Sequence, residues 1–351
     1  MTLAPRCRIL TLAILVSVAA DLAAISALDA AQGDPHPFVV NLRGEPSDPG
    51  CQNAALVSAG GAAPKDPRRL AIRWIGYSNF ELVYNGQIIL LDAYYDRGST
   101  YPPLGVKAAD IRKADVLLIG HGHFDHMSDA ATIAARTKAI VVGAAITTDK
   151  LMTQALDRAQ VRTVTGRGGE VLQFGGIKVE PILARHGEPP PNVTAAFTTA
   201  LRSVTSPPTA EQTAELTAIR QRGASDPRLT TEGTIAYLIT LDNGFTVMYR
   251  DSGGRVTDQE RAAMAKAGRV DVALVAIAAD YLNTLTAQRA LEHIRTYKPD
   301  VFIPAHHDAS LNELWRPTEP IFQALKADNP ALITVSRGYR EPVCFDTTRR
   351  P

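Results

Sequence analysis

Three histidines and an aspartate lie within one six-residue window, at His121, His123, Asp125 and His126. Imidazole nitrogen and carboxylate oxygen are ligands that suit zinc and similar divalent metals. His121 and His123 are two residues apart, so in an extended segment both side chains project to the same side and can hold one ion. Asp125 and His126 follow where the chain is expected to turn toward a helix capped by Ser128, which would direct them at a second ion. The cluster therefore predicts a metal site.

A single histidine is more often a core or surface residue than a metal ligand. Here three of the eight histidines of the chain share one short window with a carboxylate, and that density favours metal binding. His36 and His293 have no such context, because one lies in a Gly/Pro-rich stretch and the other inside an expected helix. We expect both to be structural or exposed.

A buried strand is expected to position the cluster. The run 116–120 is apolar and ends in Gly, which is typical of a fully buried strand. Open α/β sheets gather their functional residues at the carboxyl ends of such strands. Three more candidates, His186, Asp251 and His306, also follow apolar strands in Gly- or Pro-marked loops. Each has an ordinary explanation as a loop or turn residue, but together with the cluster they complete the ligands of two metal ions.

The order of the expected elements predicts the fold class. The first half has a hairpin at Asn85-Gly86, a strong two-residue turn signal, followed by β/α alternation. The second half repeats this order, with a hairpin at 242–244 and no sequence repeat between the halves. Two such halves predict an α/β protein in which two sheets pack together with helices outside. We expect one domain over residues 70–345, with an insert at about 187–231 that is a lid, a specificity element or a surface excursion.

The composition is that of an ordinary soluble protein, with 351 residues, 45% hydrophobic, 21% charged and a net charge of +1. This balance gives no reason to expect nucleic acid as a partner. Arg6 and Arg8 precede a mostly apolar run over 9–20 and then small residues, which predicts a secretory signal peptide within 1–31. The run is short for a bilayer span. We therefore expect a periplasmic or secreted protein with no stable membrane anchor after signal cleavage; an uncleaved N-terminal anchor is the alternative.

Two cysteines would remain after signal cleavage. Residues 32–69 are expected to form an irregular arm and 346–351 a tail, and Cys7 would leave with the signal. An exported compartment permits disulfides, and the remaining even count fits one bridge between Cys51 and Cys344. The bridge would tie the arm to the C-terminal strand. Metal ligation by the two cysteines is the weaker alternative, because neither has a neighbouring Cys or His.

The histidine cluster and the residues that follow it resemble the metallo-β-lactamase superfamily. The run His-x-His-x-Asp-His matches the defining motif of that superfamily, and the later order of His186, Asp251 and His306 matches its remaining ligands. The resemblance spans about residues 70–345 and implies a four-layer αβ/βα sandwich. Four shorter segments resemble the branch of ascorbate-phosphate lactonases and N-acylphosphatidylethanolamine phospholipase D-like hydrolases: Trp74-Ile75-Gly76, Leu91-Asp92, Asp251-Ser252-Gly253 and Pro304-Ala305-His306.

The resemblance also assigns ligands to two ions. It implies one ion held by His121, His123 and His186, another held by Asp125, His126 and His306, and Asp251 as the bridge. Two positions depart from the superfamily pattern. Arg250 stands where a Gly often precedes the bridging Asp, and His307 stands where an aromatic residue often follows the last ligand. His307 is thus a candidate proton donor, substrate contact or alternative ligand.

These observations predict an exported binuclear metal-dependent hydrolase that acts on a small-molecule substrate. Two cations that share a water lower its pKa and supply a hydroxide, which would cleave an ester, lactone or phosphodiester bond. The expected cofactors are two divalent ions, zinc in the first place, with manganese or iron as alternatives. Asp125 is the candidate catalytic residue that orients the nucleophile or relays its proton. Asp92 is a candidate partner of a ligand histidine, and a loop-capping role is the equally weighted alternative. The alternatives are an iron-binding redox variant of the same fold and a non-catalytic metal-binding protein; the oligomeric state stays open.

Overall fold

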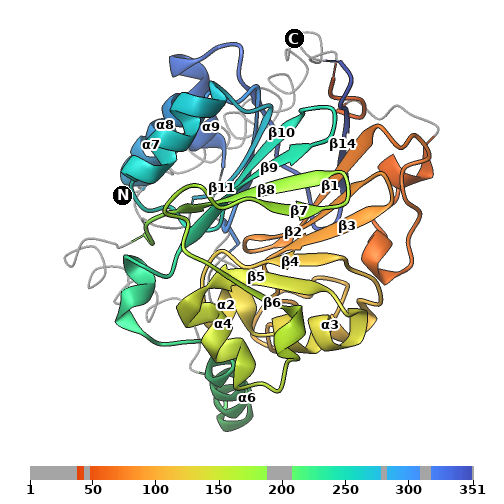
Figure 1. Cartoon of the computed structure of the whole chain (residues 1–351), viewed down its shortest axis with the longest axis vertical. Helices are drawn as coiled ribbons and strands as arrows, with labels where there is room; N and C mark the ends of the chain where they lie inside the picture. The colour runs from red at the N-terminus through yellow and green to blue at the C-terminus, as the bar shows by residue number, and fades with distance from the viewer. Residues whose placement is uncertain (1–37, 43–47, 188–207, 278–282, 309–317, 350–351) are drawn as a thin grey trace, which may run out of the picture.

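The computed structural model describes residues 38–42, 48–187, 208–277, 283–308 and 318–349. Two seven-stranded sheets pack face to face, and helices cover their outer surfaces (Figure 1). The strand order is β14-β1-β2-β3-β4-β5-β6 in the first sheet and β13-β12-β11-β10-β9-β8-β7 in the second. This is the predicted four-layer αβ/βα sandwich, so the predicted fold class is confirmed.

The first sheet combines an antiparallel part with a parallel part. Its strands are β1 (Arg69–Gly76), β2 (Asn79–Tyr84), β3 (Gln87–Leu91), β4 (Val116–Leu118), β5 (Ile140–Ala144), β6 (Val161–Val164) and β14 (Pro342–Asp346). The predicted hairpin between β2 and β3 is confirmed, since Asn85 and Gly86 both have positive φ, at 46° and 78°. Strands β3 to β6 run parallel, so their carboxyl ends meet at one edge.

The second sheet has the same mixture. Its strands are β7 (Leu172–Phe174), β8 (Ile177–Leu183), β9 (Ile235–Leu241), β10 (Thr246–Arg250), β11 (Val272–Ala276), β12 (Val301–Ala305) and β13 (Ile333–Thr334). Strands β7 to β10 are antiparallel, with the predicted turn at 242–244 between β9 and β10, and β10 to β13 are parallel. The strands therefore deliver several chain segments to one edge of this sheet too.

The helices form the two outer layers. Near the first sheet lie α2 (Phe124–Met127), α3 (Ala130–Thr137) and α4 (Ala145–Met152), and beside the second lie α7 (Asp258–Ala267), α8 (Asn283–Tyr297) and α9 (Glu319–Asp328) (Figure 1). The insert contributes α6 (Ala210–Gln221), and 3-10 turns occur at Pro49–Cys51, Val57–Ala59, Ala108–Asp110, Arg158–Gln160 and Pro227–Thr230. One expectation is corrected: the chain turns into a helix at Phe124, inside the histidine cluster, rather than at Ser128.

Three apolar layers hold these elements together. The central layer lies between the sheets and includes Ile72 and Val247 from their facing surfaces. The first outer layer packs Leu117 of β4 against Ile133 of α3, and the second packs Met248 of β10 against the α8–α9 helices. Neighbouring residues of one strand face different layers, as the two-residue period of a strand requires. The strand ends that carry the candidate ligands thus extend from a rigid core.

The described part of the N-terminal arm is held against the first sheet. A bridge pairs Val39 with Phe345, and Cys51 forms a disulfide with Cys344 of β14, as the even cysteine count predicted. The predicted signal peptide, residues 1–31, lies outside the described residues, as does much of the insert, 188–207. Among the described helices, none is long and apolar enough to cross a membrane.

We expect reduction of this disulfide to destabilise the protein. The bridge joins residues 293 positions apart, so it restricts a very long loop of the unfolded chain and should contribute about 2–4 kcal/mol. Thermal unfolding with and without dithiothreitol should then show a melting temperature lower by about 5–10 °C in the reduced protein. The Cys51→Ser/Cys344→Ser double variant is the control, and its melting temperature should not respond to the reductant. Equal melting temperatures of the reduced and oxidised wild type would contradict this contribution.

Candidate metal site

The seven predicted ligands converge where strands of both sheets end. His121, His123, Asp125 and His126 follow β4, while His186 follows β8, Asp251 follows β10 and His306 follows β12. Their donor atoms form three groups, each with all its atoms within 4.8 Å of one another: His121, His123 and His186; His121, His126 and Asp251; and Asp125, His126 and His306. Side chains from four distant segments therefore meet in one place.

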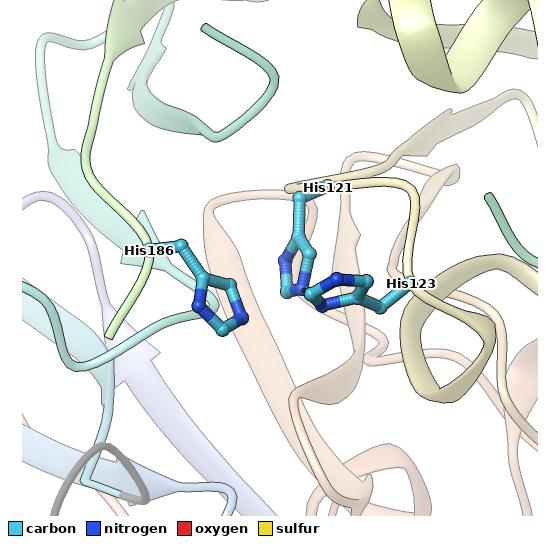
Figure 2. Close-up of side chains that lie close together, drawn as sticks. All are labelled: His121, His123 and His186. Carbon is cyan, nitrogen blue, oxygen red and sulfur yellow. Dashed lines mark hydrogen bonds between the residues drawn. The ribbon is translucent and has the colours of Figure 1, made fainter. Parts of the chain in front are cut away.

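The first group consists of three imidazoles that face one another (Figure 2). Nε2 of His121 lies 2.9 Å from Nδ1 of His123, and the ring centroid of His186 lies 4.6 Å from that of His121 and 4.8 Å from that of His123. Burial is the main cause that lowers the pKa of all three rings, to about 2 for His186. The rings are therefore neutral at pH 7, and neutral imidazole is the form that binds a metal.

Asp251 links the first group to the second. One carboxylate oxygen, Oδ2, lies 2.5 Å from Nδ1 of His121 and 3.4 Å from Nδ1 of His126. The side chain is fully buried, and its other oxygen, Oδ1, has no hydrogen-bond partner among the described residues. A buried carboxylate oxygen without a partner is costly, and a cation would offset that cost.

The glycine at the end of the strand run makes room for Asp251. A Cβ added at Gly120 would lie 2.1 Å from Cγ of Asp251, which is far closer than real contacts allow. A residue with a side chain would not fit at position 120, because the Asp251 carboxylate packs directly on the backbone there.

The third group is built around His126. Nε2 of this ring lies 3.7 Å from Oδ2 of Asp125, and Nε2 of His306 lies 3.4 Å from the same oxygen. On the opposite side of the ring, Nδ1 of His126 contacts Oδ2 of Asp92 at 2.6 Å, while Oδ1 of Asp92 accepts a hydrogen bond from the Gly120 amide at 2.9 Å. Asp92 thus fixes the ring and leaves Nε2 directed at Asp125, which is how a carboxylate supports a metal-binding histidine.

Charge in the third group favours a cation. Burial disfavours the protonated ring of His126, but the carboxylates of Asp125, Asp92 and Asp251 outweigh it and raise its pKa to about 10. Burial alone would raise the pKa of Asp125, yet the neighbouring His126 and His306 hold it well below its usual value. Without a metal, the carboxylates therefore keep a proton on His126 that a divalent cation would replace. The donor set, five imidazoles and two carboxylates, fits one or two divalent transition metals.

His307 belongs to none of the three donor groups found among the described residues. Its side chain is buried, and its ring stacks on Trp74 with the centroids 4.2 Å apart and the planes 20° from parallel. Its suggested role as an alternative ligand gains no support from the donor groups of the described residues, and its role as a proton donor stays a prediction. His293 is buried in α8, where Nε2 contacts the Gly254 carbonyl at 2.8 Å, in agreement with the structural role expected for it. His36 lies outside the described residues.

The sequence did not single out the residues that hold His306. This residue has a positive φ of 59°, and its amide donates to the Tyr77 carbonyl at 2.7 Å. The Tyr77 amide donates to Oδ1 of Asp308 at 2.8 Å, and Arg97 donates to Oδ2 of Asp308 at 2.7 Å. Asp308 could have been suspected from its position two residues after a ligand, but Arg97 carries no such signal.

The insert contributes part of the surroundings of the third group. Ile219 of α6 packs with Tyr77 and Tyr94, and the side chain of Arg222 pairs with Asp129 at 3.3 Å. The Ala224 amide donates to the carbonyl of Gly122, inside the histidine cluster, at 2.7 Å. Residues 210–224 therefore contact the elements that carry the donors, which agrees better with a covering or specificity element than with a surface excursion.

Comparison with known proteins identifies relatives that share this architecture. A family model described as the beta-lactamase superfamily domain matches residues 71–306. A UPF0173 metal-dependent hydrolase of Polynucleobacter asymbioticus is 26% identical over 293 residues, which cover 82% of this chain and 89% of that protein. Another UPF0173 metal-dependent hydrolase, of Thermoplasma acidophilum, is 25% identical over 239 residues, which cover 68% of this chain and 84% of that protein.

Solved structures show the same fold. Igni18, a metallo hydrolase from the hyperthermophilic archaeon Ignicoccus hospitalis, superposes with a TM-score of 0.53 at 15% identity, and the match covers 79% of this chain and 98% of that one. A possible metal-dependent hydrolase from Veillonella parvula gives a TM-score of 0.50 at 14% identity, with 77% and 97% covered. At such low identities the likeness concerns the fold and not the substrate.

Proposed function

The chain belongs to the metallo-β-lactamase superfamily, and on this premise we propose that it is an exported hydrolase that uses two divalent metal ions. The observation that carries the proposal is the convergence of seven donors into three overlapping groups that share His121 and His126. Overlap of this kind suits two adjacent ions better than one, because five imidazoles and two carboxylates exceed the four ligands of a single closed zinc site.

The candidate residues would have separate roles in metal binding and catalysis. When bound, the two ions lower the pKa of a water molecule and polarise the bond that is cleaved. His121, His123 and His186 would hold one ion, Asp125, His126 and His306 the other, and Asp251 would contact both. Asp125, which is partly exposed in its donor group, would orient a water molecule or accept its proton. Zinc is the proposed metal because imidazole-rich sites suit it; manganese or iron would also accept this ligand set.

The proposed substrate is a small molecule with an ester, lactone or phosphodiester bond. Hydrolysis itself is supported by the relatives, which are named metal-dependent hydrolases. The more specific likeness to lactonases and phospholipase D-like hydrolases rests on short segments such as Asp251-Ser252-Gly253. Export is supported by the signal-like segment 1–31 and by the Cys51–Cys344 disulfide, since disulfides persist in oxidising compartments.

A substrate panel tests this function. Zinc-loaded mature protein would be assayed against lactones, phosphodiesters and β-lactams, before and after removal of metal with a chelator. We expect at least one class to be hydrolysed, activity to disappear with the metal and to return when zinc is added back. Hydrolysis that survives complete metal removal, or no hydrolysis of any class by protein that carries two ions, would contradict the proposal.

A further inference from the structure

Arg250, which departs from the superfamily pattern, is a fully buried arginine at the end of β10. Its guanidinium donates to three backbone carbonyls and one carboxylate. Nη1 donates to the carbonyl of Ser252, and Nη2 donates to those of Arg185 at 3.1 Å and Arg255 at 3.0 Å. Nε donates to Oε1 of Glu260 at 2.8 Å. A planar guanidinium with several fixed donors can bind such a set, whereas a lysine ammonium cannot.

Two of the three carbonyls that Arg250 binds belong to sequence neighbours of predicted ligands. Arg185 directly precedes His186, and Ser252 directly follows Asp251. The two loops are also joined by a hydrogen bond from the Gly187 amide to Oγ of Ser252 at 2.8 Å. They lie so close that a Cβ added at Gly254 would fall 2.1 Å from the Arg185 carbonyl oxygen. The guanidinium of Arg250 therefore connects the loop that carries His186 with the loop that carries Asp251.

Glu260 holds Arg250 from the other side. This carboxylate is fully buried and also accepts hydrogen bonds from the Thr257 amide, at 2.8 Å, and from the hydroxyl of Tyr297. Thr257 caps α7 and Tyr297 belongs to α8, so the guanidinium is anchored to two helices of the outer layer. A charge in this position costs desolvation energy, and only a well-satisfied network offsets that cost.

We propose that Arg250 is a positioning residue that sets the separation between His186 and Asp251 for metal binding. The inference rests on the proposed function, because it concerns ligands of the proposed ions. The two ions should respond unequally to the loss of Arg250. His186 belongs to the group with His121 and His123, whereas the group of Asp125, His126 and His306 contains neither residue that Arg250 positions. Because Asp251 would contact both ions, loss of Arg250 should weaken zinc binding at both steps, with the larger loss for the ion held by His186.

Zinc titration of metal-free protein against a competing chelator tests the inference. The wild type should show two binding steps. Arg250→Met should weaken one step by about 10- to 100-fold, the usual effect of residues that orient ligands, and the other step by a smaller factor. Arg250→Lys, which keeps the charge but cannot reach all the carbonyls, should give a smaller loss. The melting temperature of each metal-free variant separates metal binding from stability.

Arg73→Met is the matched control. Arg73 is also a fully buried arginine, paired with the buried Glu81 at 3.3 Å, and it donates to the carbonyl of Gly50 at 2.6 Å in the N-terminal arm. The control should lower the melting temperature of the metal-free protein and leave both zinc affinities unchanged. If Arg250→Met binds both ions like the wild type, or if Arg73→Met loses the same step, the inference is overturned.

A variant that does not fold and a wild type that binds no zinc have different consequences. If Arg250→Met does not fold, Glu260→Gln replaces it, because glutamine preserves the helix cap and removes only the charge that anchors the guanidinium. This variant should also weaken one step more than the other, and unchanged zinc affinities would overturn the inference. A wild type that binds no zinc would instead overturn the proposed function.

Discussion

Replacing Asp125 with alanine should lower hydrolysis by at least about 10³-fold while the chain stays folded. Asp125 supplies the carboxylate of the donor group that also contains His126 and His306. Alanine would leave two imidazoles to hold that ion and would remove the group placed to orient water. The side chain is partly exposed on the short helix α2, so its loss leaves the apolar layers intact. The measurement is kcat/KM on the best substrate of the panel, together with the melting temperature.

Asp149→Ala controls for the loss of an aspartate on a neighbouring helix. Asp149 is exposed on α4 and belongs to none of the donor groups found among the described residues. Its replacement should leave kcat/KM within about twofold, as for most surface substitutions. Activity retained in Asp125→Ala at the level of this control would refute the catalytic role of Asp125.

Replacing Asp251 with asparagine should weaken zinc binding at both steps by at least about 10²-fold. The carboxylate contacts His121 and His126, which are shared between the donor groups. Its oxygen Oδ1, which has no hydrogen-bond partner in the described part of the chain, is the atom available to a cation. Asparagine keeps the shape of the side chain, so it removes charge with little change in packing. Competition titration with zinc measures both steps.

Asp92→Asn is the comparison for this second prediction. Asp92 is as deeply buried as Asp251, but its side chain reaches the donor groups through His126. Its loss should weaken mainly one step, by about 10- to 100-fold. A bridging position for Asp251 would be contradicted if Asp251→Asn kept both zinc affinities of the wild type. It would also be contradicted if Asp251→Asn and Asp92→Asn weakened both steps equally.

The local patterns of the sequence predicted the parts of the molecule that depend on neighbouring residues. The hairpin at Asn85-Gly86 follows from the backbone preference of these two residues for positive φ. The apolar run 116–120 defines a buried strand, and residues that follow such strands come together because the sheet gathers them at one edge. His186, Asp251 and His306 were therefore brought to the histidine cluster by sheet topology, which the alternation of strands and helices already indicated.

Local sequence patterns could not predict contacts between distant segments of the chain. Arg97 and Asp308 are 211 residues apart and meet only because the ends of the two sheets meet. His306 has a positive φ of 59°, which the sequence does not specify. Arg250 was visible as a departure from a family pattern, but the three carbonyls it binds belong to loops whose approach is a consequence of packing.

The most direct test of two metal ions in this site is the metal content of the purified mature protein. After removal of all metal and reloading with excess zinc, followed by removal of free zinc, inductively coupled plasma mass spectrometry should find two zinc ions per chain. The metal content should fall toward one per chain in a variant that loses a ligand of a single group, such as His186→Ala. A wild-type content of one ion per chain or less would contradict the binuclear site.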